Sequence, residues 1–211
     1  MFRRSAALAA AYAALAVLVA AGAMNGLDQW SVEHLMPGFG DATVVSSTLE
    51  AIVPLLHSHW DTTLAAIGNV VTLPAQALIS SAVAAACWIV LARRGRTHAA
   101  LAWVVAWIAA NAVEVLCKSV LSRPLLHHKG APLWAFQSSW PSGHTVRSVL
   151  LAATVAAVWP AAGRWVAAWA AASLVFLEVD GFHVPTDIAG GLLLAVLAAG
   201  IARREAAYER R

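Results

Sequence analysis

Long apolar runs separated by short polar stretches form the pattern of this chain. A helix that crosses a membrane needs about 20 mostly apolar residues, and six stretches approach that length. They are residues 5–24, 64–91, 99–121, 144–159, 165–179 and 186–202. The pattern predicts an all-α, polytopic membrane protein: a six-transmembrane-helix bundle with short extracytoplasmic loops or interfacial helices. We expect a single domain over residues 1–211, with the short fourth and fifth spans ending near the headgroups or inside the bundle.

The composition excludes an ordinary soluble domain. Of the 211 residues, 61% are hydrophobic and 12% are charged, and the mean hydropathy is +0.71. A soluble domain carries about 25% charged residues to cover its surface. We therefore expect membrane lipids as partners and no nucleic acid, and the composition leaves the oligomeric state open.

The basic residues indicate which end of the bundle faces the cytoplasm. Cytoplasmic loops carry an excess of Lys and Arg, which predicts a multi-pass plasma-membrane protein with both termini cytoplasmic. The N-terminal run also resembles a signal peptide, but its length favours an uncleaved first helix. Residues 25–61 would then lie outside, with Trp30 and Trp60 at interface depth. Ten of the 14 lysines and arginines fall on the cytoplasmic side if the six spans are right: Arg3, Arg4, Arg93, Arg94, Arg96, Arg164, Arg203, Arg204, Arg210 and Arg211.

The other four basic residues map to the outer ends of the third and fourth spans or to the loop between them. They are Lys118, Arg123, Lys129 and Arg147. A charged side chain within a span costs about 2.5–3.5 kcal/mol near the bilayer centre and less near its ends. Several basic groups together suit a multiply charged anion. Glu114 either supports this set of basic residues or simply neutralises Lys118, because residues at i and i+4 share one helix face.

Two histidines begin helices at the same outer end. His183 precedes the sixth span, and Asp187 follows four residues later. This spacing lets the carboxylate fix one imidazole nitrogen and leave the other free to attack. His144 starts the fourth span after Ser142 and Gly143, which offer a hydroxyl and backbone N–H donors. A lone histidine at a helix end is usually a polar interface residue, but this combination favours phosphoryl transfer, which needs a nucleophile, an acid and charge stabilisation.

No metal-binding set is evident in the sequence. The pairs His57/His59 and His127/His128 have no nearby carboxylate or cysteine ligands at the usual spacing. We expect loop or headgroup contacts for these histidines, and neither a metal nor a cofactor.

Three motifs carry a family resemblance. KSVLSRP at 118–124, PSGH at 141–144 and GFHVPTD at 181–187 resemble the three-part signature of the type 2 phosphatidic acid phosphatase superfamily. The resemblance covers residues 114–191 and implies a metal-independent lipid phosphate phosphatase. In that scheme His183 attacks phosphorus, Asp187 orients it, and His144 protonates the leaving oxygen and then activates water. The groups that would hold the phosphate are Lys118, Arg123, Ser142 and Gly143.

The chain departs from the family pattern at two arginines. The first motif is often written Lys-x-x-x-x-Arg-Pro-Arg-Pro, and Leu125 stands at its second arginine. The third motif carries Ser-Arg before the histidine, where this chain has Phe176 and Leu177. We expect Arg147, one turn after His144, to compensate for the missing phosphate-binding arginines. Two acids near the outer end of the fifth span either brace Arg147 or are interface acids without a role: Glu178 and Asp180.

The motifs and their departures from the family pattern favour two functions. The first is a phosphatase acting from the outer face on a lipid phosphate or diphosphate, with polyprenyl diphosphate, phosphatidic acid, phosphatidylglycerol phosphate and a phosphorylated glycolipid precursor all open. The second is a catalytically impaired relative that binds or moves anionic lipid, which the missing arginines favour. A small-solute transporter fits less well, because there is no inverted repeat. Three aromatic residues of the outer loop line an entrance or form an ordinary interface belt: Trp134, Phe136 and Trp140.

Overall fold

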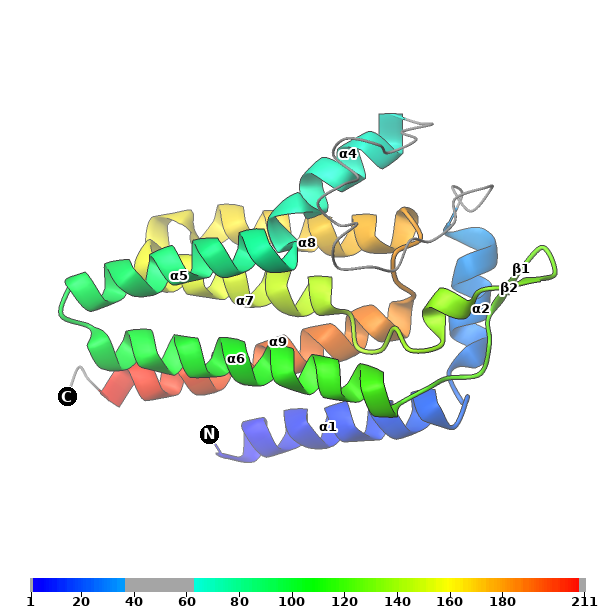
Figure 1. The fold of residues 1–211 in the computed structure, drawn as a ribbon. Helices are drawn as coiled ribbons and strands as arrows, with labels where there is room; N and C mark the ends of the chain where they lie inside the picture. The colour runs from blue at the N-terminus through cyan, green and yellow to red at the C-terminus, as the bar shows by residue number, and fades with distance from the viewer. Residues whose placement is uncertain (1, 37–62, 209–211) are drawn as a thin grey trace.

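The computed structural model describes residues 2–36 and 63–208, and most of this part is helical (Figure 1). Its α-helices are α1 (Phe2–Ala20), α2 (Asn25–His34), α4 (Thr63–Thr72), α5 (Ala77–Arg93), α6 (Thr97–Val120), α7 (Gly143–Val158), α8 (Gly163–Val179) and α9 (Pro185–Tyr208). Short 3-10 helices are η1 (Leu73–Ala75), η2 (Trp134–Phe136) and η3 (Pro160–Ala162). Strands β1 (His127–His128) and β2 (Ala131–Pro132) pair as a small antiparallel hairpin. The predicted all-α class is confirmed.

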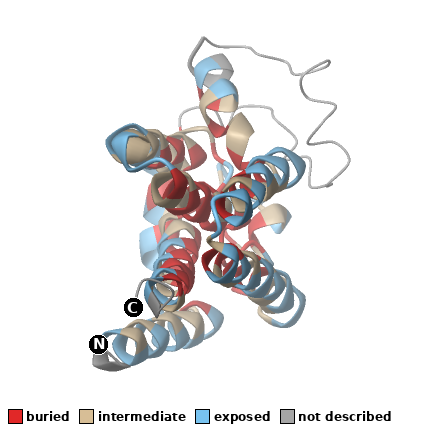
Figure 2. Cartoon of the chain, turned by 90° about the vertical axis from the view of Figure 1, so that its left-hand side faces the viewer, coloured by how far each residue is buried: buried red, intermediate tan, exposed pale blue. Residues whose placement is uncertain are grey.

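The long helices form a bundle around α7. Helix α7 packs against α5, α6, α8 and α9, and α9 also packs against α1 and α6. Seen end-on, the buried residues gather in the middle of the bundle and the exposed residues cover its outside (Figure 2). Both chain ends lie toward the end of the bundle opposite to α2, which stands across the other end (Figure 1).

The outward faces of the bundle are apolar. In α6 the inward face carries Trp103, Trp107 and Glu114, while Leu101 and Ile108 on the other face are 59% and 61% exposed. A helix that is apolar on all sides belongs either to the core of a large protein or to a membrane. Because protein does not cover these side chains, the surface indicates a membrane protein.

The number of membrane spans depends on how the bent helices are counted. Three described helices are long and apolar enough to cross a membrane, namely Thr97–Val120, Pro160–Val179 and Pro185–Ala207. Two bent helix pairs raise the number to five if each pair is one span. Helix α7 has 16 residues, so it is about 24 Å long against about 30 Å of hydrocarbon. Six separate spans therefore stay a prediction.

Two of the predicted spans are broken in the structure. The span expected over 64–91 bends by 50° between Ile67–Ala75 and Ala77–Arg93, and Pro74 in η1 explains the break because proline has no N–H to donate. The span expected over 5–24 ends at Ala20, and α2 follows at 77°. Gly22 in this turn has a φ of +74°, a left-handed conformation that glycine adopts without strain.

A small apolar cluster fixes α2 to the end of the bundle. It consists of Val32, Met36, Leu126, Phe136 and Val184, each at most 3% exposed. Complete burial of one such side chain is worth about 1.5–3 kcal/mol. The cluster joins α2, the loop between α6 and α7, and the start of α9, which are the segments that surround the candidate site.

Candidate functional site

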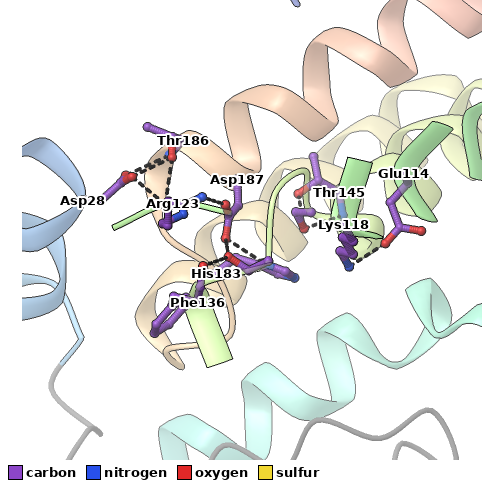
Figure 3. A network of polar contacts seen from close by, with 11 residues as sticks. Asp28, Glu114, Lys118, Arg123, Phe136, Thr145, His183, Thr186 and Asp187 are labelled. Carbon is purple, nitrogen blue, oxygen red and sulfur yellow. Dashed lines mark hydrogen bonds and ion pairs between the residues drawn. The ribbon is translucent and has the colours of Figure 1, made fainter. Parts of the chain in front are cut away.

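Helix ends that are far apart in the sequence meet at the α2 end of the bundle (Figure 3). His183 lies in the turn between α8 and α9, and Asp187 lies in the first turn of α9. His144 is the second residue of α7, and Lys118 is in the last turn of α6. The structure therefore brings these four expected site residues to one end of the molecule.

His183 and Asp187 form the pair that their spacing predicts. Nδ1 of His183 lies 3.2 Å from Oδ2 of Asp187, and both residues are buried. The same Oδ2 accepts a hydrogen bond from Ser139 Oγ at 2.6 Å. Because a carboxylate faces Nδ1, the ring proton belongs on that nitrogen and Nε2 carries the lone pair. His183 is thus arranged to act through Nε2 as a nucleophile or base.

The surroundings of His183 favour a neutral ring. Burial lowers its pKa below the usual 6.5, and the positive charges of Lys118 and Arg147 lower the pKa further. Asp187 raises the pKa but does not reverse the shift. A neutral imidazole at pH 7 keeps the lone pair that nucleophilic attack requires.

The His144 ring lies next to the His183 ring. The two ring centroids are 6.0 Å apart, and the ring planes are inclined by 56°. Reacting groups lie about 3–3.5 Å apart in near-attack geometry, so at this separation both rings are within reach of one phosphoryl group. The ring of Phe182, which is 40% exposed, lies 6.4 Å from the His144 ring and places an apolar surface beside the two histidines.

The turn between α8 and α9 sets the position of His183. Gly181 has a φ of +74°, the left-handed conformation that commonly ends a helix. After it the chain turns back, and the His183 N–H donates to the Leu177 carbonyl at 2.9 Å. Pro185 then begins α9, where the missing N–H is harmless. Leu177 is 1% exposed and packs inside the bundle.

The start of α7 is tied directly to α9. Ser142 Oγ accepts a hydrogen bond from the Thr145 N–H at 3.2 Å, so Ser142 caps the helix. The Ser142 N–H donates to the Asp187 carbonyl at 2.9 Å. A Cβ on Gly191 would lie 2.6 Å from the Ser142 carbonyl oxygen, so glycine is needed for this close packing. The first N–H groups of a helix have no hydrogen-bond partner within the helix. In α7 these groups lie at the end that carries His144.

Arg123 contacts Asp187 of the His183–Asp187 pair and is 3% exposed. Its Nη2 contacts Oδ1 of Asp187, and its Nη1 donates to Oδ2 of Asp28 at 2.6 Å. Both terminal nitrogens therefore hold carboxylates in this structure. The geometry supports a role in fixing Asp187, while the predicted contact of Arg123 with phosphate stays a prediction.

Asp28 was not singled out by the sequence analysis. It comes from α2, is 1% exposed, and binds Thr186 at the start of α9 as well as Arg123. Its Oδ2 accepts from Thr186 Oγ1 at 2.7 Å, and its Oδ1 accepts from the Thr186 N–H at 3.2 Å. A chain of polar contacts thus runs from Asp28 through Arg123 and Asp187 to His183 (Figure 3). No local spacing signals this chain, because α2 joins it only through tertiary packing.

A second polar cluster contains Glu114, Lys118 and Arg147. Lys118 Nζ lies 2.5 Å from Glu114 Oε1, which confirms the predicted i,i+4 pairing. A Cβ on Gly143 would lie 2.6 Å from Glu114 Oε1 and 2.8 Å from Arg147 Nη1. Glycine at the start of α7 therefore allows an acid and an arginine to approach the same point.

Arg147 lies within the site and not on the lipid-facing side. Its Nε donates to the Ala75 carbonyl at 2.8 Å, and its Nη1 lies 3.5 Å from Asn111 Oδ1. Its charge acts on His183, as described above. The expected replacement of a missing motif arginine by Arg147 stays a prediction.

The two acids near the end of α8 have other neighbours than Arg147. Glu178 Oε1 accepts a hydrogen bond from Ser31 Oγ at 2.7 Å. Asp180 lies against Gly68 of α4, and its Oδ2 is buried without a hydrogen-bond partner among the described residues. Burial raises the pKa of Asp180 to about 6. Among the described residues the acid beside Arg147 is Glu114, so the alternative in which Glu178 or Asp180 braces Arg147 is not seen.

The aromatic residues of the outer loop behave differently from one another. Trp134 is 63% exposed, whereas Phe136 and Trp140 are 1% and 2% exposed. The prediction that Phe136 and Trp140 line an entrance or form an interface belt is wrong. Phe136 belongs to the apolar cluster under α2, and the Trp140 ring packs 5.0 Å from the Tyr12 ring.

Within the described ranges, no group of three or more His, Cys, Asp or Glu side chains is arranged to hold a metal ion. His127 and His128 form β1. His57, His59 and Trp60 lie outside the described residues.

Comparisons with known proteins give no relative. No protein-family model, no curated protein and no solved structure matches this chain.

Proposed function

We propose that this protein is an integral membrane phosphatase that hydrolyses the phosphomonoester or diphosphate of a lipid at the extracytoplasmic face. The observation that carries the proposal is the buried His183–Asp187 pair with the His144 ring 6.0 Å from the His183 ring. The resemblance of the three sequence motifs to the type 2 phosphatidic acid phosphatase superfamily supports the same assignment.

The reaction has two steps that share His144. In the first, Nε2 of His183 attacks phosphorus, the bond from phosphorus to the lipid oxygen breaks, and His144 gives its proton to that oxygen. The lipid alcohol, or the lipid monophosphate from a diphosphate, leaves, and the phosphoryl group remains on His183. In the second, His144 takes a proton from water, the water oxygen attacks phosphorus, and the phosphorus–nitrogen bond breaks to release inorganic phosphate.

The groups proposed to hold the phosphoryl oxygens lie on α6 and α7. The Lys118 side chain is 33% exposed beside Glu114, so it can turn toward an incoming phosphate. The backbone N–H groups of Gly143 and His144 stand at the positive end of a helix, which favours anions. Arg147 adds a further positive charge near the same helix start. Hydrogen bonds to charged groups contribute about 1.5–3 kcal/mol each, so several of them can stabilise the transferred phosphoryl group.

The length of α7 supports a lipid as the substrate. Its 16 residues span about 24 Å, which is about 6 Å less than the hydrocarbon core of a bilayer. If its far end reaches the cytoplasmic headgroups, His144 lies just below the outer headgroups. A lipid phosphate can reach that depth while its tail stays in the membrane. The arginines at the opposite end of the bundle support a cytoplasmic position for both termini.

The test is release of inorganic phosphate by the detergent-purified full chain without added metal. The panel contains polyprenyl diphosphate, phosphatidic acid and phosphatidylglycerol phosphate, and the order of rates narrows the substrate. We expect the His183→Gln variant to release none. The matched control is His34→Gln, which changes an exposed histidine of α2 that bonds to its own helix, and this variant should keep the wild-type rate.

A second measurement tests the covalent step. With a ³²P-labelled diphosphate, whose leaving group needs little protonation, a His144→Gln variant should accumulate acid-labile label on the protein. Addition of His183→Gln should remove the label. Lipid binding without phosphate release by the folded wild-type protein would contradict the enzyme. That result would favour a lipid-binding relative, consistent with the leucines at 125 and 177 and with the buried position of Arg123.

A further inference from the structure

A second candidate site lies at the end of the bundle away from the histidines. It is a pocket between α6, α7 and α9 with a volume of about 240 Å³. One water needs only about 10–15 Å³ of such space, and pockets for drug-sized ligands measure about 300–1,000 Å³. The pocket therefore suits a headgroup-sized ligand and not a whole lipid. Its lining residues are Arg96, Trp103, Ala156, Ala157, Arg203 and Ala206.

The shape of the pocket follows from the residues that meet there. Trp103 is 2% exposed and forms an apolar wall from α6. The alanines of α7 and α9 have short side chains, which leave space between the helix ends. Arg96 stands directly before α6, and Arg203 is exposed on the last turns of α9. The two arginines thus come from segments that are far apart in the sequence and line one pocket.

The charges of the pocket point to an anion. Its lining contains two arginines and no carboxylate. Arg96 Nη1 donates to the Ala157 carbonyl at 3.4 Å, a long hydrogen bond, and a guanidinium offers five N–H donors. In the part of the chain that the structure describes, the Arg96 side chain makes this one hydrogen bond, so most of its donors remain for a ligand. The planar fork of arginine matches the oxygens of a phosphate, and two forks on one group give specificity as well as charge.

We propose that the pocket formed by Arg96, Trp103 and Arg203 binds the phosphate group of an anionic lipid headgroup. The arginines bind the phosphate oxygens. Trp103 and the alanines contact the carbon atoms next to the phosphate in the headgroup. Under the proposed topology this end faces the cytoplasmic leaflet, whose anionic lipids attract basic groups near the membrane surface. The binding does not depend on the proposed phosphatase activity, because the histidines lie at the other end of the bundle.

The experiment measures binding of short-chain phosphatidylglycerol to the detergent-purified full chain by native mass spectrometry. We compare an Arg96→Gln/Arg203→Gln variant with an Arg93→Gln/Arg164→Gln variant. The second pair removes the same two charges from the same end of the bundle, but neither residue lines the pocket. We expect the first variant to bind at least tenfold more weakly than wild type and the second to bind like wild type.

Two further arms decide the source of the phosphate and the specificity of the site. If millimolar inorganic phosphate displaces the lipid, free phosphate is also a ligand of the pocket. If phosphate does not displace the lipid, the lipid is the specific ligand. Displacement and its absence both support a site for a phosphate group. Equal weakening in the two double variants, or equal binding of phosphatidylcholine, would overturn the proposal. The single variant Arg203→Gln, at an exposed position, gives a severalfold weakening if the double variant does not fold.

Discussion

Loss of the negative charge at Asp28 should destabilise the whole α2 end of the bundle. In the wild-type protein the buried carboxylate accepts one hydrogen bond from Arg123 and two from Thr186. An Asp28→Asn substitution keeps the size of the side chain but replaces one acceptor oxygen by an NH₂ donor. Arg123 Nη1 and the Thr186 N–H can only donate, and they bind different oxygens of Asp28. Whichever oxygen becomes NH₂, one of these contacts becomes a clash of donors, and Arg123 loses one of its two carboxylates.

The magnitude follows from the burial of the pair. Removing one partner of a buried ion pair costs about 3–5 kcal/mol. Asp187 still contacts Arg123 in the variant, so the lower value of about 3 kcal/mol applies. For chains of 150–250 residues, 1 kcal/mol shifts the Tm by about 2–4 °C. We therefore expect Asp28→Asn to lower the Tm by about 6–12 °C.

Thermal unfolding of the detergent-purified protein, followed by tryptophan fluorescence, checks this value. Glu33→Gln is the matched control, because Glu33 is an exposed acid on the same helix that pairs only with Gln29 in the contacts seen. Its Tm should lie within about 2 °C of wild type, as for most surface changes.

The shared position of Arg123 between two carboxylates also predicts an order of Tm values. Arg123→Gln leaves Asp28 and Asp187 without their shared cation, so it should lower the Tm more than Asp28→Asn. An Asp28→Asn Tm equal to that of the Glu33→Gln control, or a milder effect of Arg123→Gln, would refute the reasoning.

Three further predictions concern packing and pH. Gly143→Ala should lower the free energy of unfolding by about 1–3 kcal/mol through overpacking, because the new Cβ would lie 2.6 Å from Glu114 Oε1. Gly200→Ala, whose new Cβ would meet nothing within 4 Å, should raise the free energy of unfolding by about 0.4–1 kcal/mol. A lower Tm in both variants would contradict the packing assignment. Burial raises the pKa of Asp180 to about 6, above the usual 3.8, so its contribution to stability is present below about pH 4 and is lost as the pH rises through about 6. Asp180→Asn should therefore show a smaller Tm decrease between pH 4 and pH 8 than wild type. Because burial lowers the pKa of His183 below 6.5, the acid limb of phosphate release should have its midpoint below pH 6.5, and a midpoint above that value would argue against a neutral His183 nucleophile.

Contacts within one helical turn were predictable from the sequence. The Glu114–Lys118 and His183–Asp187 pairs both have i,i+4 spacing and both form. These features were accessible because helix geometry alone places such side chains within reach.

The apolar pattern by itself determined the all-α class and the presence of membrane-like helices, because those properties depend on local composition. The breaks at Pro74 and Gly22 also have local causes, although the apolar pattern runs through both residues. Only the tertiary structure decided that Arg123 binds Asp28, 95 residues away, and that Glu114 rather than Asp180 stands beside Arg147. The partner of a buried charge depends on which helices pack together, and packing joins residues whose separation along the chain carries no periodic signal.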